Sequence, residues 1–368
     1  MRESLHQTTA RSKASLCATL ALLAMLVGSV IAAEAPELRD DLPRDSLLAA
    51  LNQSRAYLDK LPDDRVIAAR PRKITAADMK SSLRRFGETL DLWGQPEKFA
   101  DAIRARFDFI APATGTEKKE LLVTGYYLPL VDARLTESAA YGYPLYRKPD
   151  GSLASLSRRE IDILKRLKGK GYEIAWVKDP IDVFFIHAQG SALLRLEDGR
   201  TVQLNYAANN GRPYTSIGKI LIDEKKIASD EMSAQRLRRY LAEHPAGRDA
   251  LLARNERYVF FRFIEGGPLG SLEAQLTPGR SVAADPDYFP RGGPLFLKSR
   301  LPVVDAKGGL GGWRTFSRFV FAQDSGAAIR GPGRLDLYFG AGDEAGDGAG
   351  FMKSGGSVYI LLEKKSGP

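Results

Sequence analysis

The pattern of apolar residues changes near residue 107, and this change constrains the fold more than any other feature. Before it, apolar residues recur at helical spacing, which predicts helices over 46–61, over 75–93 and from Pro96 onward. Beyond it, short runs rich in β-branched and aromatic residues are separated by turns. A chain of 368 residues with this pattern predicts two domains in a mainly β, α+β fold, with N-terminal helices followed by a barrel-like sheet.

The expected strands are short and spread over the rest of the chain. They cover 121–127, 182–186, 193–196, 201–206, 257–263, 281–284, 294–297, 316–321, 335–339 and 357–362. His187 would extend the second of these strands. Two helical stretches, 158–167 and 233–243, interrupt the series, and the acidic segment 34–45, which contains prolines, is expected to be loose.

The N-terminus has the pattern of an export signal. Basic residues precede an apolar run over 14–31, and the small residues Ala32 and Ala33 follow it. Cleavage after either alanine would release the mature chain into the periplasm. A retained membrane helix is the weaker interpretation, because the run contains Gly28 and Ser29 and lacks about 20 strongly apolar residues.

The only cysteine, Cys17, lies in the middle of this run and would be removed with it. The mature protein would then have no disulfide bond and no thiolate chemistry. Because Cys17 is not at the end of the run, a lipid anchor is not expected either, although association with the outer membrane stays open.

The net charge and the small number of histidines limit which partners and which catalytic mechanisms are expected. The net charge is +9, and removal of the signal leaves +7, which suits an anionic polymer as partner. Nucleic acid is not expected, because the chain is exported and its lysines and arginines are spread along it. His187 and His244 have no zinc-ligand spacing, and no Gly-x-Ser-x-Gly motif is present. We therefore expect no metal and no cofactor.

Three aspartates in the segment 321–346 are the candidates for catalysis. Asp324 follows an apolar run and opens a Ser-Gly turn, Asp336 lies within an apolar strand, and Asp343 lies in a Gly-rich loop beside Glu344. Carboxylates are seldom buried without a reason, and burial among apolar side chains raises a carboxyl pKa, which suits a general acid. A structural role is the alternative for each, since turns and strands also use aspartate.

Four ordered blocks between residues 121 and 362 carry further motifs. They are 124–127 with 143–147, 179–191, 206–218, and 276–281 with 324–346. As a set, the blocks resemble the family of membrane-bound lytic murein transglycosylase A. The resemblance implies a double-psi β-barrel domain with N-terminal helices, built from 34–127 and 263–368, after a signal over 1–33. A second β domain over 128–262 would be inserted, with a groove between the two.

The resemblance also implies an activity. Family members cleave peptidoglycan between N-acetylmuramic acid and N-acetylglucosamine without water, forming 1,6-anhydro ends during cell-wall turnover. The catalytic acid of the family falls on Asp336, with Asp324 as its companion and Asp343 as a third acidic position. Because the muramic 6-hydroxyl is a tethered nucleophile, one carboxyl group can act as both acid and base.

Substrate-binding residues follow from the same motifs. Tyr126, Tyr127 and Tyr214 could stack on sugar faces, although core packing is an equal alternative for each tyrosine. Hydrogen bonds to sugar groups are expected from further polar side chains, namely Thr124, Gln189, Ser191, Thr215, Ser216 and Asp343. Arg280 and Arg334 would pair with carboxylates of the peptide stems, with solvated surface arginines as the alternative.

Other functions stay open at this stage. Asp336 and Asp324 could form the pair of an inverting glycoside hydrolase, which needs a carboxyl separation of roughly 6.5–9.5 Å. Asp324-Ser-Gly326 also matches an aspartic protease loop, but a single copy would require a symmetric dimer. A non-catalytic peptidoglycan-binding protein is the third alternative. We expect a monomer with peptidoglycan glycan strands as partner, and association with cell-wall synthesis or division complexes stays open.

Overall fold

Six strands close into a barrel in the computed structural model, which describes residues 37–112 and 121–365. The predicted signal and Cys17 lie outside these residues. The ring runs in the order β12 (Pro294–Val304), β13 (Leu310–Asp324), β11 (Ser281–Ala283), β14 (Arg334–Ala341), β4 (Leu121–Leu128) and β15 (Lys353–Glu363). Pairing of β15 with β12 closes it, and β3 (Phe107–Ile110) adds to β15. The neighbours β11 and β13 are parallel, as are β14 and β4.

The barrel interior is filled by alternate residues of these strands. Leu335 and Leu337 of β14 pack inside together with Val123 of β4, and all three are almost fully buried. Because successive side chains of a strand point to opposite faces, Asp336 and Thr124 fall on the outer face. The apolar neighbours of Asp336 in sequence therefore belong to the core, while its own carboxyl points away from it.

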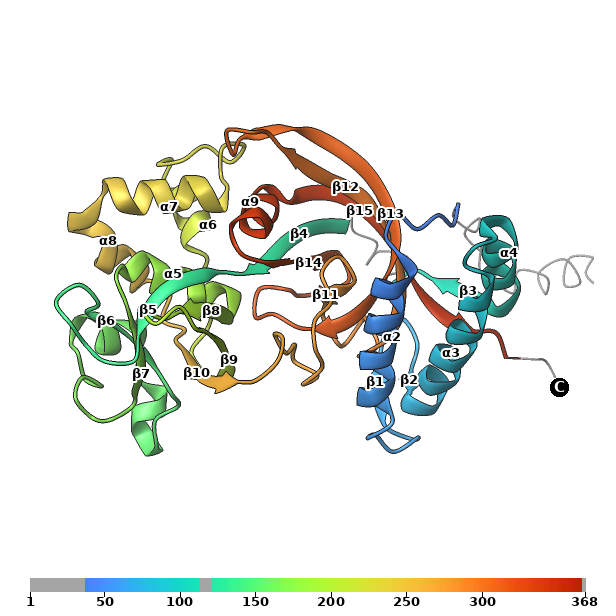
Figure 1. The fold of residues 1–368 in the computed structure, drawn as a ribbon, viewed down its shortest axis with the longest axis horizontal. Coiled ribbons are helices and arrows are strands. Elements are labelled where there is room, and N and C mark those ends of the chain that lie inside the picture. The colour runs from blue at the N-terminus through green and yellow to red at the C-terminus, as the bar shows by residue number, and fades with distance from the viewer. Residues whose placement is uncertain (1–36, 113–120, 366–368) are drawn as a thin grey trace, which may run out of the picture. The chain divides into compact units, whose positions relative to one another are not determined.

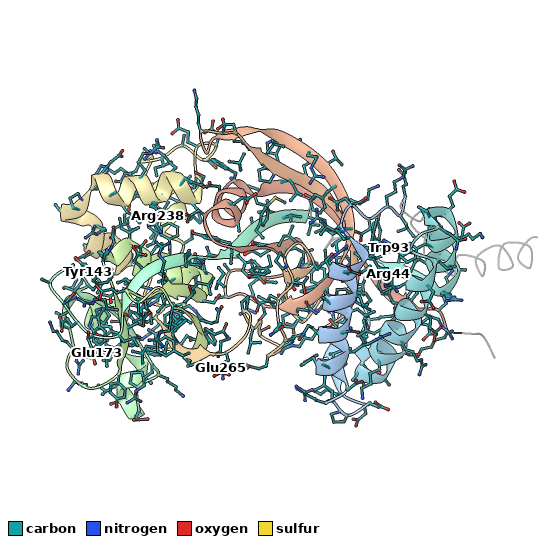
Figure 2. All side chains as sticks on the ribbon, in the orientation of Figure 1. Arg44, Trp93, Tyr143, Glu173, Arg238 and Glu265 are labelled. Atoms are coloured by element: carbon teal, nitrogen blue, oxygen red, sulfur yellow. The ribbon has the colours of Figure 1, made fainter. Side chains whose placement is uncertain are left out.

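Three helices cover one side of the barrel: α2 (Arg44–Leu58), α3 (Ala76–Thr89) and α4 (Pro96–Arg106) (Figure 1). A capping box between Thr75 and Asp78 starts α3, and Phe86 in this helix contacts the rings of Phe319 and Phe321 from β13. The short strands β1 (Val66–Ala68) and β2 (Ile74–Thr75) and the 3-10 helix η1 (Leu90–Leu92) join these helices. Figure 2 shows the side chains that fill this part, with Arg44 and Trp93 labelled.

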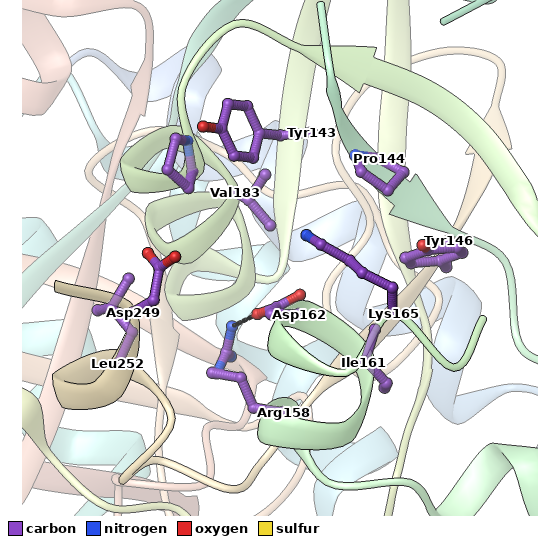
Figure 3. Close-up of a pocket in the computed structure, with 11 residues that line it drawn as sticks. Tyr143, Pro144, Tyr146, Arg158, Ile161, Asp162, Lys165, Val183, Asp249 and Leu252 are labelled. Atoms are coloured by element: carbon purple, nitrogen blue, oxygen red, sulfur yellow. Dashed lines mark hydrogen bonds and ion pairs between the residues drawn. The ribbon is translucent and has the colours of Figure 1, made fainter. Parts of the chain in front are cut away.

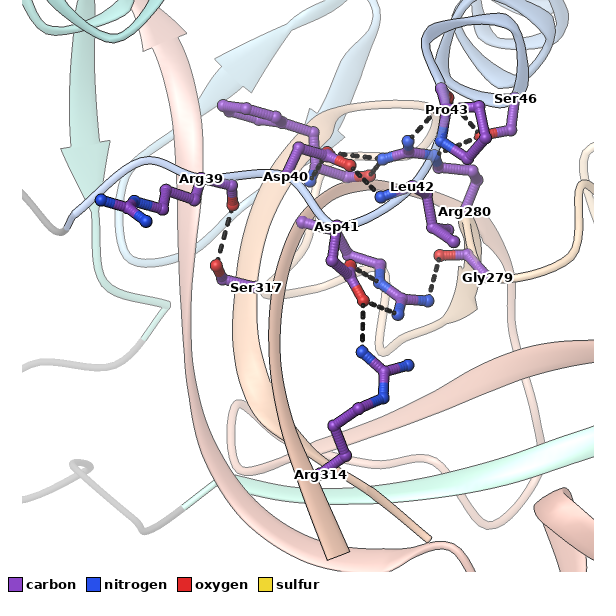
Figure 4. A network of polar contacts seen from close by, with 12 residues as sticks. Arg39, Asp40, Asp41, Leu42, Pro43, Ser46, Gly279, Arg280, Arg314 and Ser317 are labelled. Atoms are coloured by element: carbon purple, nitrogen blue, oxygen red, sulfur yellow. Dashed lines mark hydrogen bonds and ion pairs between the residues drawn. The ribbon is translucent and has the colours of Figure 1, made fainter. Parts of the chain in front are cut away.

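The segment before α2 is fixed to the barrel by buried ion pairs (Figure 4). The guanidinium of Arg280 is fully buried and lies 2.6 Å from Asp40, and it also donates to Ser46 Oγ and to the carbonyl of Phe319. Beside it, Arg318 donates to Asp41 at 2.7 Å. The expectation that 34–45 is loose is therefore wrong for residues 38–45. The role expected for Arg280 in binding substrate is also wrong, because Asp40 already neutralises it.

A second sheet of six strands lies beside the barrel. Its order is β10 (Val259–Ile264), β9 (Thr201–Asn209), β8 (Ser191–Arg195), β5 (Leu130–Arg134), β7 (Glu173–Val177) and β6 (Tyr143–Tyr146). The helices of this part are α5 (Pro180–Gln189), α6 (Ile217–Asp223), α7 (Ala234–Glu243) and α8 (Pro245–Leu252). Two short helical turns, η3 (Gly151–Ser155) and η4 (Arg159–Ile163), complete it, and η4 is all that forms of the helix expected over 158–167.

The strand predicted over 182–186 is wrong, because these residues form helix α5. Asp179 caps this helix, Pro180 is its first residue, and Gly190 ends it in a left-handed conformation. Val183 and Ile186 pack on the second sheet, whereas Phe184 and Phe185 pack against α6, α7 and α8. A helix buried on two sides has a continuous apolar run, which periodicity cannot distinguish from a buried strand.

The Gly-rich loop predicted around Asp343 is also wrong, because Asp343–Phe351 forms helix α9. This helix lies directly on β4 at Gly125, where an added Cβ would come within 2.9 Å of the Ala349 Cα. The glycine of the Thr124-Gly-Tyr-Tyr127 block thus permits close packing of a helix on the barrel. Among all helices of residues 37–112 and 121–365, none is long and apolar enough to cross a membrane.

Candidate active site

A cleft of about 660 Å³ lies between the outer face of the barrel and the second sheet. The barrel contributes Tyr126 from β4, Asp336 from β14 and the loop 324–330 after β13. The opposite wall is built by the end of α5 and by β8, β9 and β10. Both candidate catalytic aspartates therefore face one hollow that is large enough for several sugar units.

The strand register places Asp324 and Asp336 at the same height along the barrel. Ala283 of β11 pairs with Asp324 on one side and with Asp336 on the other. Asp336 in turn pairs with Thr124 of β4. Two strand spacings place the Asp324 and Asp336 backbones roughly 9–10 Å apart. Ala283, whose side chain is a single methyl group, lies between them in the sheet.

Asp336 has the properties of a general acid. Burial raises its pKa from 3.8 to about 6, opposed by the hydrogen bond from Thr124 Oγ1 at 2.8 Å and by the positive charge of Arg334. The negative charge of Asp324 adds to the increase in pKa. The side chain stays partly accessible from the cleft. With this pKa about a tenth of Asp336 is protonated at pH 7, far more than for a free aspartate, and its side chain faces the cleft.

Asp324 is held by the loop that precedes β11. The backbone N–H groups of Ser271 and Ser325 both donate to its Oδ1 at 2.8 Å. Gly270 permits this arrangement, because an added Cβ would lie 2.4 Å from the carbonyl oxygen of Gln323. Burial raises the pKa of Asp324, and the two backbone N–H groups oppose that rise. Asp324 is thus fixed in position, with its second carboxyl oxygen not engaged by these bonds.

Tyr126 lies close to both carboxyl groups. Burial, aided by the charges of Asp324 and Asp336, raises the pKa of its hydroxyl well above the usual value. The hydroxyl is near enough to Asp324 to favour its ionised form, but it forms no hydrogen bond with any described residue. Its ring packs on Tyr338 at 5.2 Å between centroids. Tyr126 is therefore both a packed aromatic residue and an unused polar group in the cleft.

A second, much smaller cavity of about 40 Å³ lies behind η4 (Figure 3). Arg158 lines it and pairs there with Asp162 at 3.3 Å, and burial raises the pKa of that carboxyl. The volume suits one or two water molecules and not a sugar ring. No group of acidic, histidine or cysteine side chains suited to a metal ion occurs within the described residues. The larger cleft is the candidate for catalysis.

Comparison with known proteins identifies the family. Residues 153–262 match the MltA specific insert domain, and residues 280–362 match the 3D domain. Membrane-bound lytic murein transglycosylase A of Vibrio cholerae is 32% identical over 295 residues, covering 78% of this chain and 77% of that protein. The chain belongs to the membrane-bound lytic murein transglycosylase A family. The Escherichia coli K12 member is 35% identical over 241 residues, which span 65% of this chain and 64% of that relative.

Solved structures of the transglycosylase A family agree with the fold. E. coli MltA with bound chitohexaose superposes with a TM-score of 0.73 at 27% identity, over 91% of this chain and 93% of that one. A membrane-bound lytic murein transglycosylase from Agrobacterium tumefaciens gives 0.70 at 29% identity, over 87% and 92%. The predicted fold class, a mainly β fold with a double-psi β-barrel and an inserted second sheet, is confirmed.

The cleft brings together six of the catalytic and sugar-binding residues predicted for the transglycosylase site. These are Tyr126, Gln189, Ser191, Tyr214, Asp324 and Asp336. Thr124 joins them through its hydrogen bond to Asp336. Tyr214 is partly exposed at the cleft surface and thus available for stacking.

Four of these predicted residues do not line the cleft, and one of them, Thr215, donates its backbone N–H to Asn255 Oδ1. The ring of Tyr127 packs against Gly346 of α9, while its backbone N–H donates to Gln189 Oε1 at 3.2 Å and so orients that side chain. Ser216 caps α6 by accepting from the Lys219 N–H. Asp343 is the first residue of α9, where a negative charge stabilises the positive end of the helix dipole.

Sequence reasoning missed His187 as a cleft residue because it placed it in a strand. Arg158 lies 3.0 Å from His187 Nδ1 and can only donate, so the neutral imidazole carries its proton on Nε2. Burial and the charge of Arg158 hold the His187 pKa well below its usual range. The Nε2–H is buried and has no partner in the described chain, as is true of Asn205 Oδ1. The sequence signal that could have identified His187 as a cleft residue was its position within the 179–191 block.

Proposed function

We propose that this chain is a lytic transglycosylase that cleaves peptidoglycan between N-acetylmuramic acid and N-acetylglucosamine and forms 1,6-anhydro-N-acetylmuramic acid ends. The observation that carries the proposal is Asp336, a cleft-facing carboxyl whose pKa is raised to about 6. Family membership supports it, as does the bound chitohexaose of the E. coli relative.

The first step is protonation of the leaving group. Asp336 gives its proton to the glycosidic oxygen, the bond from this oxygen to the anomeric carbon breaks, and the N-acetylglucosamine side leaves as an alcohol. Burial favours the protonated carboxyl beforehand, while the hydrogen bond from Thr124 stabilises the carboxylate that forms. Burial thus favours the protonated carboxyl needed before this step, and the Thr124 hydrogen bond favours the carboxylate needed after it.

The second step uses the carboxylate that the first step leaves. Asp336 accepts the proton of the muramic 6-hydroxyl, and this oxygen bonds to the anomeric carbon of its own ring. Because the nucleophile belongs to the same sugar, its effective concentration is high and no water must be positioned. Asp336 ends the cycle protonated, ready for the next turnover.

Asp324 and the opposite wall serve this chemistry in different ways. Asp324, fixed by Ser271 and Ser325, adds negative charge to the burial that raises the Asp336 pKa. Gln189 and Ser191 would hydrogen-bond sugar hydroxyl and acetamido groups, and Tyr126 and Tyr214 would contact sugar faces. The barrel and its helices, 34–127 with 263–368, would form the catalytic domain, and the insert 128–262 would form the second wall.

The working form would be an exported monomer. Removal of residues 1–33 would release it into the periplasm, where glycan strands of peptidoglycan are the substrate. Anchoring through a lipidated cysteine is not part of this proposal, because Cys17 lies within the segment removed.

An inverting hydrolase is the second candidate, favoured by one observation. Asp324 and Asp336 flank Ala283 two strand spacings apart, which is compatible with carboxyl groups separated widely enough to admit water. Against it, the two backbone N–H groups that donate to Oδ1 of Asp324 stabilise its carboxylate, which weakens it as a base.

Mass spectrometry of purified sacculi digested by the mature protein tests the proposal, with Asp336→Asn in parallel. We expect anhydro-ended muropeptides from the wild type and none above background from the variant. Reducing ends, heavier by one water, would establish the hydrolase instead. Unchanged sacculi that nevertheless bind the protein would establish a non-catalytic binding protein.

A further inference from the structure

Three arginines on the barrel side of the cleft have no partner within the part of the chain that the structure describes. Arg291, Arg330 and Arg334 line the cleft, and their guanidinium groups form no hydrogen bond or ion pair with any residue of 37–112 and 121–365. The other cleft arginines are engaged by the protein. Arg262 pairs with Glu273, and Arg158 pairs with Asp162. Arg257 donates to the carbonyl of Arg212, so Arg291, Arg330 and Arg334 are the cleft arginines left without a partner among the described residues.

Arg334 is the most informative member of this group. It lies two residues before Asp336 on β14, so both side chains point to the outer face of the barrel. Its Nε–H is buried and has no partner among the described residues. Its charge opposes the rise in the Asp336 pKa, which places the guanidinium within electrostatic reach of the acid. A buried donor without a partner next to the scissile position is suited to an incoming ligand.

The chemistry of a guanidinium selects the ligand. Its planar N–H groups match a carboxylate in a bidentate arrangement, and a neutral sugar offers no charge to compensate three cations. In a murein glycan only the muramic unit carries carboxylates. They come from two sources: the lactyl group of a muramic unit without peptide, or the peptide stem attached to that lactyl group.

We propose that Arg291, Arg330 and Arg334 form an anion-binding site for the carboxylate borne by the muramic unit at the cleavage position. This inference rests on the proposed function, since it names the substrate group that the same cleft recognises. It implies that the protein discriminates muramic glycans from neutral chitin-type oligosaccharides, and that charge pairing with Arg334 fixes the muramic unit next to Asp336.

The test measures binding by calorimetry in the inactive Asp336→Asn background. Three ligands are compared: chitohexaose, a murein hexasaccharide without peptides and the same hexasaccharide with peptide stems. We expect the triple change of Arg291, Arg330 and Arg334 to glutamine to weaken binding of carboxylate-bearing ligands by about 10- to 100-fold. Chitohexaose binding should change less than twofold. Arg239→Gln, which removes an exposed arginine outside the cleft, is the matched control and should have no effect on any ligand.

The pattern of loss identifies the source of the carboxylate. Because the peptide stem is joined to the lactyl carboxyl by an amide bond, loss only with the peptide-free ligand assigns the lactyl carboxylate, and loss only with the peptide-bearing ligand assigns the stem. Loss with both means that the site accepts either carboxylate, and each of these three results supports the site. An equal loss for chitohexaose, or no loss with either murein ligand, overturns it. If the wild type forms anhydro products while the binding result overturns the site, the proposed function is still supported. Absence of anhydro products with selective loss of binding would overturn the function and support the site.

Discussion

The barrel wall of the cleft carries both candidate catalytic aspartates in fixed register, whereas the opposite wall carries amides, an imidazole and arginines that the protein already engages. Asp324 and Asp336 stand on strands of a closed barrel, on either side of Ala283. Across the cleft, His187, Gln189 and Asn205 offer an imidazole and two amides from α5 and β9. This difference indicates that the barrel performs the chemistry and the second sheet positions the substrate.

The largest expected effect comes from removing the acid. Asp336→Asn should lower kcat by about 10²- to 10⁴-fold, because it removes the proposed proton donor to the leaving oxygen. Release of soluble muropeptides from sacculi measures it. Asp347→Asn on α9, outside the cleft, is the matched control and should keep wild-type activity. A variant with more than a tenth of the wild-type rate would contradict the assignment of chemistry to the barrel wall.

The same substitution should stabilise the fold at neutral pH. The folded-state pKa of Asp336 is about 6 against 3.8 for the free side chain, so stability is lost as pH rises from about 4 through 6. Asparagine removes that loss. We expect Asp336→Asn to increase the free energy of unfolding at pH 7 by up to about 3 kcal/mol. The gain should be smaller than this limit, because the carboxyl is partly exposed and solvent screens its charge. Urea unfolding at pH 4 and pH 7 checks it, and an equal gain at both values would count against a raised pKa.

The pH dependence of the rate reports on the same carboxyl. Because the acid must be protonated, kcat/KM should fall as pH rises through about 6, by about tenfold for each further unit. Thr124→Val removes a hydrogen bond that favours the carboxylate, so its fall should occur at higher pH. Initial rates on a soluble glycan between pH 4 and 8 measure both curves. Identical pH profiles for the wild type and Thr124→Val would show that the Thr124 hydrogen bond does not affect the pKa of Asp336.

A smaller effect is expected on the opposite wall. His187→Phe keeps an aromatic ring but removes the Nε2–H donor, and should raise KM about three- to tenfold with little change in kcat. His187→Gln, which retains an N–H donor, should recover part of the affinity. His244→Gln is the control, since His244 lies between α7 and α8 away from the cleft. A fall in kcat without a change in KM would contradict the assignment of substrate positioning to the opposite wall.

Much of the fold and part of the site followed from local patterns. The helices of the N-terminal hundred residues, the capping box at Thr75 and most strands lie close to where periodicity placed them. The helices α5 and α9 did not, because a run buried on two sides and a Gly-rich segment both lack helical periodicity. Of the site, Asp336 could be singled out as a carboxyl between apolar residues.

The sequence by itself determined which side chains alternate along each strand, and hence that Asp336 points away from the core that Leu335 and Leu337 fill. Only the tertiary structure decided what Asp336 meets there. Pairing of β14 with β4 and β11 places Thr124 on one side of it and Ala283 on the other. It also buried Arg280 against Asp40 and left the Arg334 Nε–H without a partner among the described residues. The physical reason is that strand register and ion pairing depend on segments far apart in the chain, whereas side-chain alternation is local.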